Sequence, residues 1–290
     1  MAEQDRSTRT RSWVPYSLLS PGLVWLVLFF GVPMLFLAKV SLSTRKNRFT
    51  GELGFDGNLD NYQTAFNQFG PQFARAFLYA GAATVICIVI GYPLAYFIAR
   101  YGGSWRNRLV GLVVLPFFVS YLIRTLAWQN ILADEGPFLS ILKALHLVGQ
   151  DFALLNTPWA VIGGLAYNFL PFMILPIYVS LEKIDLRLLD AASDLYASPS
   201  AAFREIVLPL SLPGVFAGTL LTFIPAAGDF VNAALLGSPK TTMIGTVVQD
   251  QFLVQLNFPV AAALAFILMT IITAAVLIYA RFLGTEGLTV

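Results

Sequence analysis

Six apolar stretches, each long enough to cross a lipid bilayer as a helix, limit what this chain can fold into more than any other feature. A membrane-spanning helix needs about 20 apolar residues. The stretches cover residues 16–42, 73–99, 109–132, 157–181, 213–236 and 259–283. Charged residues make up only 12% of the chain, whereas soluble domains contain about 25%. We therefore expect an all-α, polytopic membrane protein in which residues 1–290 form one domain with six transmembrane helices.

The distribution of Lys and Arg predicts which ends of these helices face the cytoplasm. Arg6, Arg9 and Arg11 precede the first stretch. Its apolar core is longer than that of a signal peptide and no small-residue cleavage site follows, so we expect a retained helix. The densest short basic loop, 100–108, falls on the same side and outweighs a basic cluster at 45–48, so both termini are expected inside. The segments then expected outside are 43–72, 133–156 and 237–258, and 182–212 is expected in the cytoplasm.

Motifs that the sequence lacks exclude several kinds of function. There is no G-x-x-x-x-G-K-[ST] nucleotide-binding loop, and no H-E-x-x-H or G-x-S-x-G catalytic motif. The one cysteine, Cys87, excludes an internal disulfide and a cysteine-cluster metal site. A net charge of +2 without a basic, aromatic-rich run argues against nucleic-acid binding. We therefore expect no enzymatic activity, no metal site, no cofactor bound by this chain and no nucleic-acid partner.

The stretch 182–212, called the insert below, is the polar exception, because it holds eight of the 34 charged residues. Apolar side chains at three- and four-residue spacing predict one face of a first helix: Ile184, Leu188, Ala191, Ala192 and Leu195. Ser198 and Pro199 predict the N-cap and first residue of a second helix, which Pro209 is expected to end. Such a helix–break–helix knob suits a groove on a soluble partner. The alternative is an amphipathic connector that lies on the lipid surface.

The order of residues in the insert favours the first interpretation. Asp190-Ala191-Ala192, three residues, Tyr196, nine residues and Ile206-Val207-Leu208-Pro209 follow one another. This pattern resembles the EAA loop of binding-protein-dependent ABC importer permeases, the MetI-like family, whose pattern is Glu-Ala-Ala, three residues, Gly, nine residues, Ile-x-Leu-Pro. Asp190 keeps the charge of the usual Glu. Tyr196 replaces a Gly that permits a tight elbow, so the elbow is expected to be made differently or to bend less sharply.

This resemblance implies a type I ABC importer permease fold in a bacterial inner membrane and a division of labour between subunits. A separate ATPase, in two copies that use ATP and Mg, would dock on the insert. A second, homologous permease subunit would lie beside this chain among the membrane lipids, and an external solute-binding protein would contact the outer segments. The implied ATPase-coupling residues are Asp190, Ala191, Ala192, Asp194, Tyr196, Ala197, Phe203, Ile206, Leu208 and Pro209.

Segments outside the insert resemble the permeases of polyamine importers. They are Ile123-Arg124-Thr125-x-Ala127-Trp128, residues 225–231, Leu235-Leu236-Gly237 and Met243-Ile244-Gly245. The resemblance is greatest to the first permease subunit of spermidine/putrescine importers, and it implies a small cationic substrate. Another solute, such as an opine, thiamine, iron or sulfate, is the alternative within the family. A stand-alone secondary transporter would show inverted repeats and several membrane carboxylates, which the sequence does not show.

Charged residues inside apolar stretches are candidates for the substrate pathway, because burying them in a membrane is costly. Pro225 and Gly228 predict a break in the fifth stretch, where Asp229 lies beside freed carbonyl groups that suit an ammonium ion. Asp229 facing water in an outer vestibule is the alternative. The candidate pathway residues are Asp229, Phe230, Asn232, Trp128 and Tyr121, of which the last two are also ordinary packing aromatics. Arg124 is expected in a structural ion pair or a gate, and Lys240 in an outer gate.

Overall fold

The structure is a computed structural model that describes residues 14–46 and 52–283. Arg6, Arg9, Arg11 and Arg48, used above for the orientation, lie outside these residues. The α-helices are α1 (Val14–Leu26), α2 (Val32–Ser41), α3 (Asp60–Tyr101), α4 (Arg106–Val114), α5 (Tyr121–Leu132), α6 (Pro137–Ala144), α7 (Pro158–Glu182), α8 (Arg187–Asp194), α9 (Pro199–Ala202), α10 (Leu208–Ala227), α11 (Val231–Leu236), α12 (Ile244–Leu253) and α13 (Phe258–Leu283). Two π-helical turns, η1 (Val27–Gly31) and η4 (Phe203–Val207), and three 3₁₀ turns, η2 (Gly103–Trp105), η3 (Leu115–Phe118) and η5 (Pro239–Thr241), join some of them. Strands β1 (Ser43–Arg45) and β2 (Leu53–Phe55) form an antiparallel hairpin.

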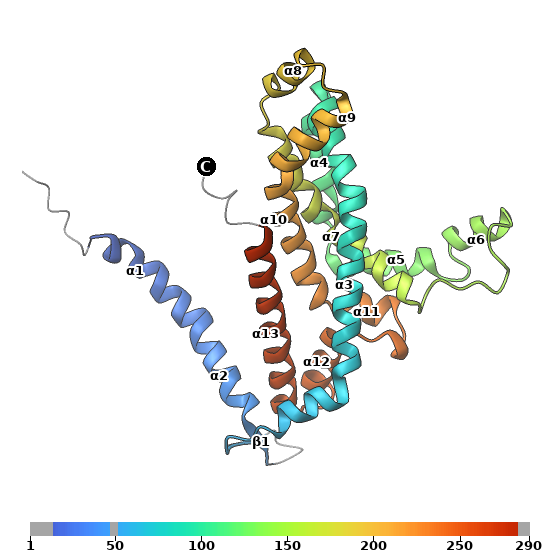
Figure 1. Cartoon of the computed structure of the whole chain (residues 1–290). Helices are drawn as coiled ribbons and strands as arrows, with labels where there is room; N and C mark the ends of the chain where they lie inside the picture. Colours follow the sequence, from blue (N-terminus) through green and yellow to red (C-terminus); the bar gives the residue numbers. More distant parts are fainter. Residues whose placement is uncertain (1–13, 47–51, 284–290) are drawn as a thin grey trace, which may run out of the picture.

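Helices α3, α7 and α10 form the core of the bundle and pack along one another (Figure 1). Two glycines on α10, Gly214 and Gly218, allow α7 to approach closely. A methyl group at Gly214 would lie 2.6 Å from the backbone oxygen of Pro176, and one at Gly218 would lie 2.8 Å from the sulfur of Met173. Small residues at this four-residue spacing let the backbones of membrane helices come together.

The first apolar stretch forms a bent rod of α1, η1 and α2 that diverges from α13 (Figure 1). Its large apolar side chains, such as Trp25 and Phe30, are exposed, and in α2 only Val40 and Ser41 are buried. An apolar helix that contacts the bundle only near the β1–β2 hairpin is compatible with a lipid environment on most of its faces.

The third apolar stretch is bent rather than straight, contrary to the expected single helix over 109–132. The segments Gly103–Phe118 and Tyr121–Ala144 meet at an angle of 92°. Val119 and Ser120 separate them, and both have extended backbone conformations. Among the described residues, five helices are therefore long and apolar enough to span a membrane, or six if this bent pair counts as one span.

The fifth stretch is broken where the sequence predicts a break. Helix α10 ends at Ala227 and α11 starts at Val231, so Gly228, Asp229 and Phe230 lie between two helices. The carbonyls of Gly228 and Asp229 lie against α12 at Gly245, where any side chain would collide with them. The break is thus in close contact with α12 as well as favoured by Pro225 and Gly228 in its own sequence.

The prediction that Pro209 ends the second helix of the insert is wrong. Residues Pro199–Ala227 form one continuous helix of 29 residues. The π-helical turn η4 directly precedes this proline, and the N–H of Leu208 donates to the carbonyl of Phe203, five residues earlier. A π-turn widens the helix, which relieves the clash between a proline ring and the carbonyl four residues before it.

Candidate functional site

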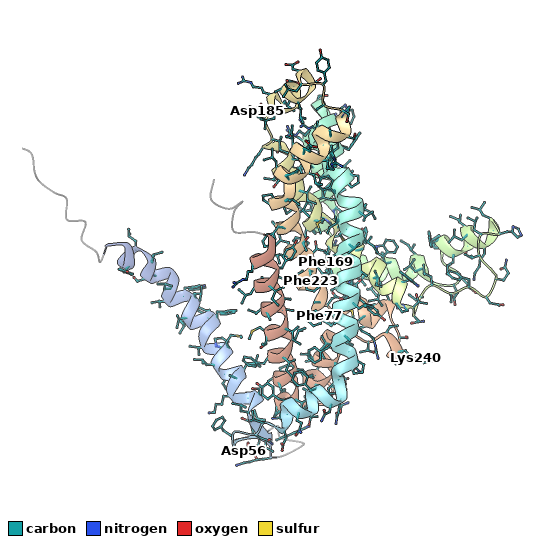
Figure 2. All side chains as sticks on the ribbon, viewed as in Figure 1. Asp56, Phe77, Phe169, Asp185, Phe223 and Lys240 are labelled. Carbon is teal, nitrogen blue, oxygen red and sulfur yellow. The ribbon has the colours of Figure 1, made fainter. Side chains whose placement is uncertain are left out.

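The insert lies at one end of the molecule, opposite the β1–β2 hairpin. Figure 1 shows α8 and α9 at this end, and Figure 2 shows Asp185 there, with Asp56 at the far end. The predicted helix–break–helix arrangement is present: α8 and α9 are separated by residues 195–198. Ser198 caps the second helix, because its side chain accepts a hydrogen bond from the N–H of Ala201 at 3.3 Å.

The predicted apolar face of α8 is only partly buried. Ile184 and Ala192 are buried, whereas Leu188 is exposed and Leu195 has 82% of its surface exposed. This predicted face is therefore covered only in part within the described chain. The reason is that α8 contacts mainly α9 and lies clear of the helical core, so no neighbouring element covers its outward side.

Tyr196 ends α8 in a left-handed turn of the kind that most often contains glycine. Its φ is 58°, in the left-handed region. Its N–H donates to the carbonyl of Ser193 at 2.9 Å, and the N–H of Ala197 donates to the carbonyl of Ala192 at 3.0 Å. These two bonds define a Schellman C-cap in which glycine is the favoured residue at the position of Tyr196. The expectation of a less sharp bend is therefore wrong, because the tyrosine adopts the strained conformation.

Both ends of the insert are fastened to the bundle. On the entry side, the guanidinium of Arg106 forms an ion pair with Glu182 at 2.6 Å and donates a hydrogen bond to the hydroxyl of Tyr178 at 2.8 Å. On the exit side, the ring of Phe203 packs edge-on against Tyr92 and Tyr96 of α3, with centroid distances of 6.0 and 5.5 Å. The two ends of the insert are therefore held against α4 and α3.

The ten coupling residues implied by the family pattern divide into an outer and an inner set. The exposed ones are Asp190, Ala191, Asp194, Tyr196 and Pro209. The others, which pack within the insert or toward α3, are buried or half-buried: Ala192, Ala197, Phe203, Ile206 and Leu208. The outer set lies mainly on α8 and the turn that follows it, which makes this part of the insert available to a partner.

A second candidate site is a buried group of polar side chains where the two helix breaks meet. We call Tyr121, Thr125, Asn168, Asp229 and Asn232 the polar clasp. The hydroxyl of Tyr121, the first residue of α5, donates to the carboxylate of Asp229 in the break after α10. The backbone N–H of Asn232 donates to the same carboxylate at 2.8 Å, and its side-chain amide donates to the Tyr121 hydroxyl at 2.5 Å. Asp229 has only 7% of its surface exposed.

Helix α7 closes the clasp from its other side. The side-chain amide of Asn168 donates to the hydroxyl of Thr125 and to the side-chain carbonyl of Asn232, both at 3.2 Å. Gly164, one turn earlier, leaves space for Asn232, whose side-chain oxygen would lie 2.6 Å from a methyl group there. The other members of the clasp are Thr125 of α5, Asn168 of α7 and Asn232 of α11. All three are almost completely buried.

The clasp lies near the middle of the bundle. The ring of Phe169 packs 6.0 Å from the ring of Tyr121, and Figure 2 shows Phe169 midway between Asp185 and Asp56. Transporter substrate sites built from discontinuous helices also lie near the middle of the membrane. The arrangement therefore fits a substrate pathway, but its carboxylate is occupied by protein donors.

The structure separates Phe230 and Trp128 from the Asp229 carboxylate. Phe230 lines an apolar cavity of about 790 Å³ between α10, α12 and α13. The ring of Trp128 packs against Tyr167 of α7 at 5.2 Å. Of the five predicted pathway residues, the structure thus joins only Tyr121, Asp229 and Asn232 through hydrogen bonds.

Arg124 is buried but has no acidic partner in the described part of the chain. Its guanidinium lies 5.7 Å from the ring centroids of both Phe117 and Tyr121. These rings lie on either side of the 92° bend, so the two cation–π contacts of Arg124 span the bend. Lys240 lies on the surface near α11 and α12 (Figure 2) and likewise has no ion pair with a described residue.

Asn168 is the member of the clasp that the sequence interpretation missed. It is an amide in the middle of α7, a helix that is otherwise apolar over most of its length. A polar side chain inside a membrane-spanning stretch is a functional or structural candidate by default, so the signal was present. Thr125 belongs to the segment 123–128 that resembles polyamine permeases, and the sequence makes no separate prediction for it.

Comparisons with known proteins agree on one kind of protein. A family model described as "Binding-protein-dependent transport system inner membrane component" matches residues 87–283. The spermidine/putrescine transport system permease protein PotB of Haemophilus influenzae is 37% identical over 258 residues, covering 89% of this chain and 90% of that protein. PotB of Escherichia coli K12 is 37% identical over 261 residues, with 89% and 93% covered. A crystal structure of a bacterial ABC transporter involved in alginate import matches with a TM-score of 0.71 at 20% identity, covering 97% of both chains.

Proposed function

The chain belongs to the family of binding-protein-dependent transport system inner membrane components, and from this we propose that it forms half of the translocation pathway of an ABC importer for polyamines. The observation that carries the substrate class is the 37% identity, over 89% of this chain, to permeases named for spermidine and putrescine transport. Each alignment covers at least 90% of the relative, so the likeness is not confined to a shared helical scaffold. The chain is a multi-pass permease of the inner membrane, and its relatives are transport proteins rather than enzymes.

We propose three kinds of protein partner. Two copies of an ATPase subunit would hydrolyse ATP with Mg, since this chain has no P-loop and binds no cofactor of its own in this proposal. A second permease subunit would complete the pathway. An external solute-binding protein would deliver the substrate, as the description of the family implies. The insert, which protrudes from the bundle and exposes its outer residues, is the proposed ATPase contact.

One continuous helix connects the insert to the clasp. Residues Pro199–Ala227 form one helix from the insert to the break that contains Asp229, a distance of about 43 Å at 1.5 Å per residue. Helix α7 carries Asn168 and ends at Glu182, which is held by Arg106. Closure of the ATPase pair would tilt α7 and α10 together, because both are fastened to the insert.

Such a tilt would move Asp229 relative to Tyr121, which belongs to α5. The Tyr121 hydroxyl is the one donor to the Asp229 carboxylate that comes from α5, whereas the Asn232 donor moves with α11. Separation of α5 from the break would therefore leave part of the carboxylate open to an ammonium group. We propose that Asp229 receives a substrate amine in this opened state, and that Tyr121 and Asn232 hold it when the site is closed.

Replacement of Asp229 by Asn tests this role. The amide keeps the shape of the carboxylate and still accepts a hydrogen bond from Tyr121, but it lacks the charge. A hydrogen bond to a charged group contributes about 1.5–3 kcal/mol, so ATP-dependent uptake of labelled spermidine into proteoliposomes should fall by about tenfold or more. Asp134→Asn is the matched control, because Asp134 is exposed in the segment between α5 and α6. It should keep normal uptake at a saturating concentration of the solute-binding protein, which is expected to contact this outer segment.

Three results would count against the proposal. Normal uptake by the Asp229→Asn importer would remove this carboxylate from the pathway. Uptake that does not depend on ATP, in the unaltered importer, would contradict the ABC mechanism itself. Equal loss of assembly and uptake in Asp229→Asn would show a structural role in place of a substrate contact, so the yield of the assembled complex has to be measured in parallel.

A further inference from the structure

Tyr196 combines backbone strain with almost complete exposure. Its φ of 58° lies in the left-handed region, where a side chain with a Cβ is crowded by the backbone and glycine is not. Its side chain has 98% of its surface exposed. Strained residues persist where they serve a function that offsets their cost. The two Schellman hydrogen bonds hold the turn, but within the described chain nothing covers the Tyr196 ring, so the ring itself is available to a partner.

The neighbours of Tyr196 define the chemistry of what covers it. Leu195, with 82% of its surface exposed, adds a second large apolar side chain to the tip of the insert. Asp190 and Asp194, one helical turn apart on α8, flank this tip and are both exposed. An apolar tip with carboxylates beside it does not suit a bilayer, because anionic headgroups repel the carboxylates and hydrocarbon excludes them. It suits a protein recess with an apolar floor and a basic rim.

We propose that the Tyr196 ring, together with Leu195, is an anchor that inserts into an apolar, basic-rimmed recess on the ATPase subunit. This inference rests on the proposed function, which supplies the ATPase as the partner of the insert. The inference goes beyond the proposed function by assigning the contact to Tyr196, the residue that replaces the glycine of the family pattern. Tyrosine is among the residues that contribute most to binding when buried at an interface.

Because the turn is left-handed, Tyr196→Gly should affect the stability of the permease and its binding to the ATPase in opposite directions. Tyr196→Gly relieves the strain, so the permease should melt at the same or a higher temperature, yet the importer should bind its ATPase about tenfold or more weakly. Tyr196→Ala keeps the strain and removes the exposed ring, so it should weaken binding to the same extent while the melting temperature stays close to that of the unaltered permease. Tyr196→Phe keeps the ring and should stay close to the unaltered protein. Binding is measured as the dissociation constant of the purified ATPase subunit for the permease pair in nanodiscs.

Tight binding of the ATPase by the Tyr196→Gly importer would overturn the anchor. The same variant tests whether Tyr196 serves folding alone. If it did, Tyr196→Gly should improve both the stability of the permease and its assembly with the ATPase. A photo-crosslinking residue, p-benzoylphenylalanine, at position 196 gives an independent measurement. Capture of the ATPase subunit in the assembled importer supports the proposal. Capture of lipid or of a second copy of this chain contradicts it.

Asp190→Arg separates failure of this inference from failure of the proposed function. Loss of the ATPase in Asp190→Arg with normal binding in Tyr196→Gly would sink only the anchor and leave the insert as the docking site. Normal binding in both variants would contradict docking through the insert, and with it both proposals. We expect both variants to lose binding of the ATPase, while the melting temperature of the Tyr196→Gly permease is not lowered.

Discussion

The hydroxyl of Tyr121 joins two helix breaks, and its removal by Tyr121→Phe is the sharpest probe of the polar clasp. Two buried groups depend on this oxygen: the carboxylate of Asp229 accepts from it and the side-chain amide of Asn232 donates to it. A hydrogen bond to a charged group contributes about 1.5–3 kcal/mol, and a buried donor left without a partner costs about 1–3 kcal/mol. Because the two effects overlap, we expect a loss of about 3 kcal/mol. The ring itself stays in contact with Phe169, so no cavity forms.

The assay is thermal unfolding of the purified complex in detergent, where this loss corresponds to a fall of about 5 °C. Tyr167→Phe is the control, because Tyr167 has 37% of its surface exposed and its hydroxyl is not part of the clasp. A double-mutant cycle with Asp229→Asn should give a coupling energy above about 1 kcal/mol. The reasoning fails if Tyr121→Phe costs no more than Tyr167→Phe, or if the effects of Tyr121→Phe and Asp229→Asn simply add.

Two further substitutions test the packing and the insert by the same unfolding assay. Gly218→Val places side-chain atoms against the sulfur and backbone of Met173, so we expect a loss of at least about 2 kcal/mol. Gly81→Ala is its control, because a methyl group there meets nothing within 4 Å, and a stable or slightly stabilised protein is expected. Ser198→Ala removes the side-chain cap of the second helix of the insert, which should cost about 1 kcal/mol. An unchanged melting temperature for Gly218→Val, or for Ser198→Ala, would contradict the corresponding contact.

Features that depend on a few adjacent residues were predictable from the sequence. The break after α10 follows from Pro225 and Gly228, which weaken a helix locally, and the structure confirms it. The N-cap at Ser198 follows from a serine directly before a proline, and the structure has this cap. In each case the physical cause lies within one helical turn of the feature.

Features that depend on distant parts of the chain were not predictable. Tyr121 and Asp229 were each identified as candidates, but they are 108 residues apart and nothing in the sequence indicates that they bond. The hydrogen bonds from Asn168 to Thr125 and Asn232, which are 43 and 64 residues away, are likewise not indicated by the sequence. These contacts decide whether a carboxylate is open or held, which is the property that matters for transport.

Pro209 and Tyr196 show how a local rule fails when the backbone adjusts. Proline ends a regular helix, but the π-turn before Pro209 relieves the clash and the helix continues. A tyrosine disfavours a left-handed turn, but the two Schellman hydrogen bonds that end α8 hold it there. In both places the hydrogen-bonding pattern around the residue, rather than its own propensity, decides the conformation.

The most direct test of the account is ATP hydrolysis and uptake by the complete importer in proteoliposomes, with its solute-binding protein loaded with spermidine, putrescine, thiamine or no ligand. The account predicts that hydrolysis and uptake rise together with the polyamine-loaded protein, and that Asp190→Arg in the insert abolishes both. Stimulation by thiamine and not by either polyamine would contradict the proposed substrate. Polyamine uptake that persists unchanged in the Asp190→Arg importer would contradict the claim that the insert couples this permease to its ATPase.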